Sequence, residues 1–265
     1  MTLALDSLVF TTEGTLLADG ENPFFFDHPL DHLPATLLLD GAVGMVTTSL
    51  PGQLAGLRLT FHRFGDPGEP VDLRLTQNGD DCERCALRFS GGGAILADGQ
   101  VAVRALADSR AFPERRSPDP VDRELVHRHR AENVAIGAVE TGAEECTAEM
   151  LDFAAEHPLR RRDPAHRGPV ELVEAARQLT TCLGHEVWEI PDDWKYVFTG
   201  LRFEQRRRVA GREPIRLRAS RMSLHRRRLD VLVELEAADG TVGSVGIEGL
   251  VAAPRIYEHL RWSQA

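Results

Sequence analysis

The sequence contains a single lysine, Lys195, so arginine supplies 30 of its 31 basic side chains. Acidic side chains number 41, and the formal net charge of the 265-residue chain is −10 at pH 7. A nucleic-acid-binding protein needs a basic face to contact phosphates. This charge balance therefore argues against nucleic acid as a partner.

Long apolar runs are also missing. No run approaches the ~18 residues that a membrane-spanning helix requires, and the first ten residues carry no basic segment of the kind that begins a signal peptide. We therefore expect a cytoplasmic protein with no membrane partner.

Cysteines are few, at positions 82, 85, 146 and 182. In a cytoplasmic protein we expect them to be free thiols. Cys82-x-x-Cys85 has the spacing of half a zinc or redox motif, but no second pair and no nearby histidine cluster completes it. We expect no metal at this pair and no cofactor elsewhere.

The first half of the chain has one helical segment followed by short strand-like segments. Residues 35–50 are apolar nearly all round, which predicts a buried helix. Strands are predicted at 54–64, 71–77 and 84–90. Residues 94–104 are interpreted as two strand ends joined by an Ala97-Asp98-Gly99 turn.

The second half repeats this order. Gly168-Pro169 begins a predicted helix over 170–187, since proline suits the first helical position. Predicted strands follow at 196–209, 214–224, 229–237 and 241–252, the last two joined by Ala238-Asp239-Gly240, and a short helix covers 254–262.

One buried helix followed by an antiparallel meander, twice, predicts an α+β double hotdog fold, in which two antiparallel sheets each wrap around a central helix. The stretch 112–120 is rich in proline and charge and is interpreted as a linker. We assign residues 1–115 to the first repeat and 116–265 to the second, and expect a monomer or homodimer because two halves in one chain can cover each other's edges.

The residues most suited to chemistry precede the first helix or lie on it. His28, Asp31 and His32 lie close together in the sequence, and Asp40 lies within an apolar helical run. A buried carboxyl must meet a partner or stay protonated, and burial would tune it and a neighbouring imidazole for proton transfer. We predict Asp40, His32 and His28 as catalytic and Asp31 as substrate-binding. The alternative is a loop or helix-capping cluster, with Asp40 bonded to backbone.

The second helix carries Glu174 at a similar depth, and we include it among the catalytic candidates. Arg177 lies one turn further on, where it can pair with Glu174 and hold it ionised in a structural role. The arginine run 160–162 is interpreted as a solvated loop rather than a phosphate site.

Three segments resemble signatures of the A-factor biosynthesis hotdog family: 26–40 (FDHPLDHLPATLLLD), 121–134 (VDRELVHRHRAENV) and 169–178 (PVELVEAARQ). The resemblance spans about residues 22–65 and 121–205, with the two halves in reversed order. Asp40 stands where the family usually has glutamate, and only the second helix keeps Glu-Ala-Ala-Arg-Gln, at 174–178.

The resemblance implies a double-hotdog enzyme of γ-butyrolactone or butenolide signal biosynthesis. Such enzymes are held to transfer a β-ketoacyl group from an acyl carrier protein to a hydroxyl of dihydroxyacetone phosphate. The expected partners are therefore an acyl carrier protein or acyl thioester and a small phosphorylated acceptor. Arg63, Arg177 or Arg202 would clamp the phosphate, and Gln178 and His127 are further candidate substrate-binding residues.

Two other functions remain open. One is a hotdog dehydratase or related acid–base enzyme acting on a carrier-bound acyl or polyketide chain, in which His28 or His32 works with Asp40. The other is a non-catalytic double hotdog that binds an acyl ligand. Fold analogy does not choose among the three, because hotdogs host many reactions.

Overall fold

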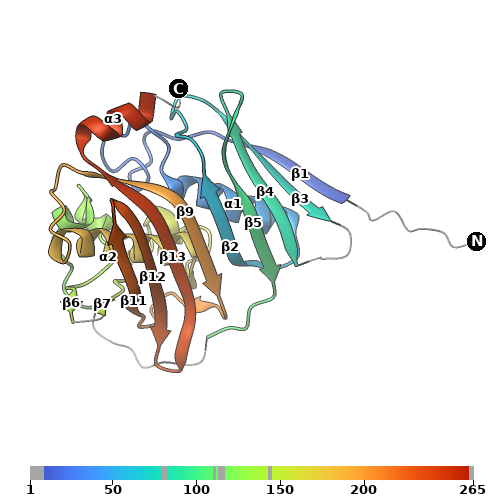
Figure 1. The fold of residues 1–265 in the computed structure, drawn as a ribbon. Helices are drawn as coiled ribbons and strands as arrows, with labels where there is room; N and C mark the ends of the chain where they lie inside the picture. The colour runs from blue at the N-terminus through green and yellow to red at the C-terminus, as the bar shows by residue number, and fades with distance from the viewer. Residues whose placement is uncertain (1–8, 79–82, 110–111, 113–116, 143–144, 263–265) are drawn as a thin grey trace, which may run out of the picture.

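The computed structural model describes residues 9–78, 83–109, 112, 117–142 and 145–262. Figure 1 shows a curved antiparallel sheet carrying two helices. The first half of the chain contains β1 (Val9–Leu16), α1 (Ala35–Ser49), β2 (Gln53–Phe61), β3 (Val71–Asn78), β4 (Arg84–Gly91) and β5 (Ala94–Arg104).

The second half begins with short elements and continues with a helix and long strands. The short elements are the 3-10 helices η1 (Arg123–Val126), η2 (Ala131–Asn133) and η3 (Pro158–Arg160) and the strands β6 (Glu140–Thr141), β7 (Cys146–Glu149), β8 (His166–Arg167) and β10 (Val209–Ala210). The longer elements are α2 (Pro169–Glu186), β9 (Lys195–Gln205), β11 (Arg216–His225), β12 (Arg228–Ala237), β13 (Gly240–Ala252) and α3 (Pro254–Trp262).

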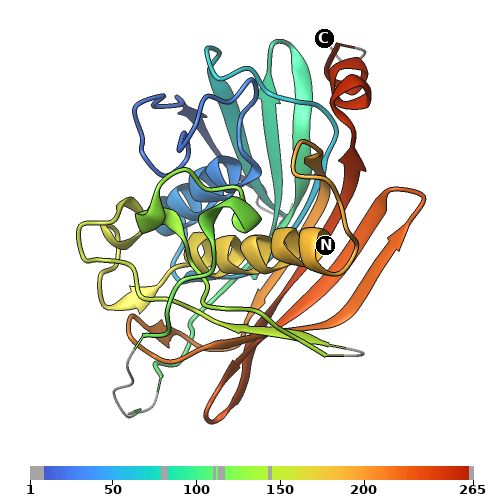
Figure 2. The same ribbon diagram turned by 90° about the vertical axis from the view of Figure 1, so that its left-hand side faces the viewer.

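Eleven strands form one sheet in the order β1-β3-β4-β5-β2-β9-β13-β12-β11-β7-β6, and β8 and β10 form a separate pair. The two halves of this sheet meet where β2 pairs antiparallel with β9. Helices α1 and α2 contact each other and lie on the same face of the sheet (Figure 2). The double hotdog prediction is confirmed, with the two expected sheets joined edge to edge.

The central helices lie where the sequence predicts them. Residues 35–50 form α1, whose Leu39, Ala42 and Val46 are fully buried. Residues 170–187 correspond to α2, which begins at Pro169 and buries most of its side chains. Helix α1 is central because its apolar surface extends nearly all round and needs cover on every side. Helix α2 is central although it buries polar side chains, which are paired with each other and with the segments that cover the helix.

One predicted turn is wrong. Residues 94–104 form the single strand β5 rather than two strand ends, and the chain reverses at Gly92 and Gly93, both of which have positive φ. Gly99 lies inside β5, where a Cβ would stand 1.8 Å from the carbonyl oxygen of Arg58 on β2. This glycine allows close backbone approach within the sheet, whereas the matching Asp239-Gly240 does form the predicted β12–β13 hairpin.

The expectations about the cysteines and the linker involve some residues that the structure describes and some that it does not. Cys146 and Cys182 are buried free thiols, and Cys85 is buried in β4, whereas Cys82 lies outside the described residues. The proposed linker also includes residues outside them, so the boundary at 115/116 stays a prediction. No helix in the described ranges has both the length and the apolar character required to cross a bilayer.

Candidate active site

A cavity of about 360 Å³ lies where the two halves meet, and we refer to it as the shared cavity. The first half contributes the loop before α1, the start of α1 and the end of β2. The second half contributes the residues after η1, the middle of α2, the start of β9 and α3. The polar side chains that line it are His28, Asp31, His32, Thr36, Arg63, His127, Arg128, Arg177, Thr181, Lys195, Tyr196 and Tyr257.

The remaining wall of the shared cavity is mostly apolar. Phe25, Pro29, Leu30, Leu33, Pro34, Ala35, Leu38, Phe61, Phe64, Gly65, Val197 and Phe198 line it. An apolar wall with a few convergent polar groups is typical of a small-molecule site. The cations Arg63, Arg177 and Lys195 come from both halves, which suits a ligand that carries an apolar chain and an anionic group.

Three histidines of the shared cavity are neutral. Burial is the main cause that lowers the pKa of His28, of His32 and of His127, the last to about 3. The positive charge of Lys195 lowers the pKa of each further. A neutral imidazole has one ring nitrogen without a hydrogen, so each of these side chains can act as a general base at neutral pH.

His32 is bonded to its sequence neighbour. Its Nδ1 lies 2.8 Å from Oδ1 of Asp31 and 2.9 Å from the hydroxyl oxygen of Tyr257. Tyr257 donates its own hydroxyl to Oδ1 of Asp31 at 2.7 Å. Helix α3 therefore fixes the orientation of the His32 ring across the cavity.

His28 faces the second half of the chain. Its ring lies 4.8 Å, centroid to centroid, from the ring of His129. The Nδ1 atom of His28 is buried without a hydrogen-bond partner among the described residues. Burial disfavours the protonated, charged form of the His28 ring, so the neutral imidazole is the more stable form.

Glu174 is fully buried and receives hydrogen bonds from several neighbours. Arg177 donates to both carboxylate oxygens, at 2.9 and 2.7 Å, and Arg128 Nε donates at 3.1 Å. These two arginines overcome the effect of burial and hold the pKa of Glu174 at about 2. The predicted Glu174–Arg177 pair is confirmed, and the carboxylate is ionised at any physiological pH.

Gln178 completes this network. Its Nε2 donates to Oε1 of Glu174 at 2.6 Å and to the backbone oxygen of Asn133 at 2.8 Å, and its Oε1 accepts from the backbone N–H of Ala135 at 2.7 Å. Gln178 is buried and does not line the shared cavity. Its contacts support a positioning role rather than the predicted substrate contact.

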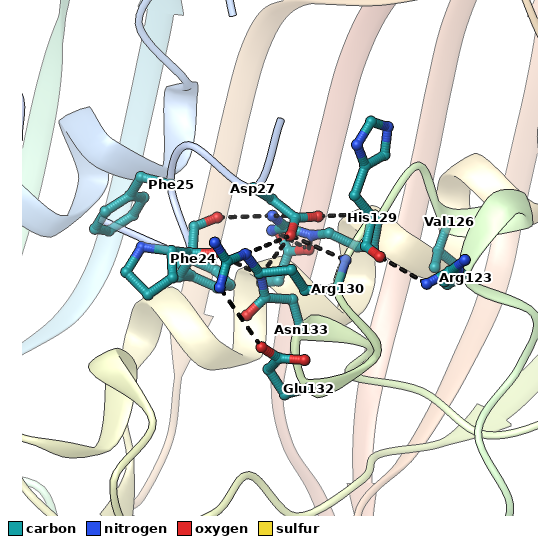
Figure 3. Close-up of polar contacts among 12 residues, drawn as sticks. Phe24, Phe25, Asp27, Arg123, Val126, His129, Arg130, Glu132 and Asn133 are labelled. Atoms are coloured by element: carbon teal, nitrogen blue, oxygen red, sulfur yellow. Dashed lines mark hydrogen bonds and ion pairs between the residues drawn. The ribbon is translucent and has the colours of Figure 1, made fainter. Parts of the chain in front are cut away.

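Asp27 ties the first half to the second (Figure 3). Its carboxylate accepts from the backbone N–H of His129 at 2.6 Å, from that of Arg130 at 3.1 Å and from Asn133 Nδ2 at 2.9 Å. Arg128 donates at 2.8 Å to the backbone oxygen of Phe24. The loop that carries His28 and His32 is thus held against the segment that carries His127.

Asp40 lies outside the shared cavity, and the expectation that it lacks a charge partner is wrong. Arg162 donates to its two carboxylate oxygens at 2.7 and 2.9 Å. Burial raises the pKa of Asp40, and Arg162 opposes this effect. The pKa of Asp40 stays raised overall, as expected for a largely buried carboxyl. Because the bidentate arginine occupies both oxygens and Asp40 does not line the cavity, the structure does not bring Asp40 together with His28 and His32.

Two further expectations need correction. The run 160–162 is a solvated loop only in part, since Arg160 is buried and pairs with Glu171 at 3.3 Å, whereas Arg161 and Arg162 are exposed and Arg162 pairs with Asp40. Arg202 does not line the shared cavity. It pairs with Glu248 at 2.6 Å on a neighbouring strand, so a phosphate clamp in the cavity must use Arg63 or Arg177.

Several residues of this site were not predicted. Tyr257 has no local pattern that reveals it, because its partners are distant in the sequence. Arg128 lies within the 121–134 segment that resembles the family, but its bond to Glu174 spans 46 positions. Lys195 did have a signal, since it is the single lysine of an arginine-rich chain. Among the described residues, no group of histidine, cysteine and carboxylate side chains is arranged to hold a metal ion.

Comparison with known proteins places this architecture among acyl-processing hotdogs. A family model for the A-factor biosynthesis hotdog domain matches residues 109–250, a range that contains the 121–134 and 169–178 segments but not the 26–40 segment. A search of curated proteins finds no match.

Solved structures match over nearly the whole chain at low identity. The dehydratase domain from the CurJ module of curacin polyketide synthase is 14% identical with a TM-score of 0.64, covering 97% of this chain and 96% of that one. A bifunctional dehydratase-cyclase domain in ambruticin biosynthesis is 17% identical with a TM-score of 0.62, covering 98% and 97%. At these identities the likeness shows the fold.

Proposed function

The chain belongs to the A-factor biosynthesis hotdog family, and we propose that it transfers a β-ketoacyl group from an acyl carrier protein to dihydroxyacetone phosphate or a similar phosphorylated hydroxyl acceptor. The coarser conclusion, a hotdog enzyme of acyl or polyketide metabolism, follows from the family and from its dehydratase neighbours. The particular reaction is our proposal.

The residues that line the shared cavity are the main support for this proposal. Arg63 and Lys195 line it beside three neutral histidines and a long apolar wall. The apolar wall suits an acyl chain, the cations suit a phosphate, and a neutral imidazole can take the proton of an attacking hydroxyl. These are the three requirements of acyl transfer to a phosphorylated alcohol.

Dehydration is the second candidate, and neutral His32 in the cavity is the observation that supports it, as a base. That reaction needs a base for the α-proton and an acid for the leaving hydroxyl. The carboxylate of α2, Glu174, cannot be the acid because Arg128 and Arg177 keep it ionised. The acid would have to be Asp31 or Tyr257, and Asp31 is itself ionised, since its bonds to His32 and Tyr257 lower its pKa against the effect of burial.

The deciding experiment incubates the protein with a β-ketoacyl-carrier thioester, with and without dihydroxyacetone phosphate, and identifies the products by mass. We expect an acyl ester of the triose phosphate only when both substrates are present. Loss of water from a β-hydroxyacyl thioester would instead support dehydration. Binding of the thioester without any product would support the non-catalytic alternative.

Variants of Arg63 and Lys195 test the phosphate site directly. We expect Arg63→Ala and Lys195→Ala each to raise the KM for the phosphorylated acceptor at least ~10-fold, the effect of losing about 1.4 kcal/mol from a charge-assisted contact. Arg202→Ala is the matched control, because Arg202 lies outside the shared cavity. An unchanged KM in both cavity variants would remove the phosphate site from the proposal.

A further inference from the structure

Two histidines from distant parts of the chain are paired beside the shared cavity. His127 follows η1 and lines the cavity, while His185 lies on the last turn of α2. Their Nε2 atoms are 2.9 Å apart. Tyr196 packs edge-on against both rings, at 5.5 and 5.9 Å.

The contacts of His185 fix which nitrogen of His127 carries the hydrogen. Nδ1 of His185 lies 2.8 Å from the backbone oxygen of Ile190, so this nitrogen must donate. In neutral His185, Nε2 then has no hydrogen and accepts from Nε2–H of His127. The remaining nitrogen of His127, Nδ1, therefore has a free lone pair.

That nitrogen belongs to a residue that lines the shared cavity. Nδ1 of His127 makes no hydrogen bond among the described residues and is not one of the buried unsatisfied atoms, so it is accessible. His127 also has φ 52° and ψ 51°, a left-handed conformation that costs a non-glycine residue energy. Backbone strain at a cavity-lining imidazole is typical of a functional position.

Tyr196 holds this arrangement in place through Gly184. A Cβ at position 184 would lie 1.7 Å from the tyrosine hydroxyl oxygen. Glycine there lets Tyr196 cross α2 and donate to the backbone oxygen of Thr181 at 3.4 Å. The tyrosine ring then packs against one side of the histidine pair.

We propose that His127 is the general base of the shared cavity and that His185 is its positioning residue. This rests on the proposed acyl transfer. Nδ1 of His127 takes the proton of the acceptor hydroxyl as the oxygen attacks the thioester carbonyl carbon. The new C–O bond forms, the C–S bond breaks, and the carrier thiolate leaves with the proton returned by the imidazolium.

Several charged and titratable groups face His127, and together they keep it neutral. Arg177 and His185 face it from α2, Lys195 and Tyr196 from β9, and His28 from the loop before α1. Burial and the positive charges among these groups lower the pKa of His127 to about 3. The lone pair on Nδ1 is therefore available at neutral pH, and the low pKa also makes this imidazole a weaker base than an ordinary histidine.

Nitrogen NMR of the imidazole rings tests the inference without any substrate. We expect His127 of the wild-type protein to be neutral at pH 8 with its hydrogen on Nε2. His185→Phe removes the acceptor and should release a mixture of tautomers, whereas His185→Gln should restore the Nε2–H form through its amide oxygen. A His127 that carries its hydrogen on Nδ1, or that titrates at its ordinary pKa, overturns the proposal.

Kinetics test the catalytic role. Asparagine tolerates the left-handed conformation, so His127→Asn should keep the melting temperature while lowering turnover at least ~100-fold. His225→Asn is the matched control, an exposed histidine at the end of β11 and away from the cavity. In His185→Phe the acid limb of the kcat/KM profile should move to higher pH, a shift that a purely structural role would not cause.

The two proposals fail in different ways. Normal turnover by His127→Asn refutes the base assignment while leaving acyl transfer intact. A wild-type protein that makes no acyl ester refutes acyl transfer, and the proposal that His127 acts as its base is then refuted with it.

Discussion

Replacing Glu174 by glutamine is the sharpest test of how the two halves are held together. The substitution preserves the size of the side chain but removes the charge that neutralises Arg128 and Arg177. It also places an amide group where the carboxylate oxygens accept hydrogen bonds. Because Glu174 is fully buried, water cannot replace what is lost.

The magnitude follows from the pKa of Glu174. It falls from 4.5 to about 2 in the folded protein. At about 1.4 kcal/mol for each tenfold change in proton affinity, the difference corresponds to about 3 kcal/mol of stability. This agrees with the 3–5 kcal/mol that breaking a buried ion pair typically costs. For a chain of this size we expect the melting temperature to fall by about 6–12 °C.

The pH dependence of this effect has a definite sign. The folded-state pKa lies below the unfolded-state value, so the stability from the ionised Glu174 is fully present above pH 4.5 and is lost as the pH falls toward 2. Melting curves of wild type and Glu174→Gln should therefore differ most at pH 7 and approach each other as the pH falls toward 2. Glu186→Gln, an exposed glutamate on the same helix, should stay within about 0.5 kcal/mol of wild type.

Two results would refute this reasoning. If Glu174→Gln melts with the wild type at pH 7, the carboxylate does not neutralise the arginines. If the difference persists unchanged at pH 3, the loss has another origin, such as packing.

Two further predictions concern other buried groups. Asp40→Asn should retain wild-type turnover, measured by product formation, because its carboxylate pairs with Arg162 outside the cavity; a 100-fold loss would restore its catalytic assignment. Burial lowers the pKa of His157 to about 4, so the stability tied to its neutral form is present above pH 6.5 and declines as the pH falls toward 4. The urea midpoint should therefore drop between pH 7 and 5, and His157→Gln should reduce that drop.

Local patterns in the sequence predicted the features that depend on neighbours along the chain. The helices at 35–49 and 169–186 follow from apolar periodicity and a proline at or before the first turn. The Glu174–Arg177 pair follows from the i,i+3 spacing on one helix face. Each of these needs only a few consecutive residues to be specified.

Contacts between residues that are distant in the sequence were not predicted, because no local pattern specifies both partners. Arg162 pairs with Asp40 across 122 positions, and Arg128 bonds Glu174 across 46. Ala97-Asp98-Gly99 and Ala238-Asp239-Gly240 look alike locally, yet only the second is a turn. Strand β1, which pairs with β3, was not predicted at all.

The electrostatics of the shared cavity link its histidines to its preferred ligand. The carboxylates of Asp27 and Glu174 are both buried and already bonded to arginines and backbone N–H groups behind the wall. Neither of them lines the cavity, where Asp31 is bonded to His32 and Tyr257 and Lys195 contributes a positive charge. That charge lowers the pKa of His28, His32 and His127. The same charge attracts an anion. Lys195 thus adds to burial, which is the main cause that keeps the three histidines neutral, and it also favours a phosphorylated acceptor, although the chain as a whole has a net charge of −10.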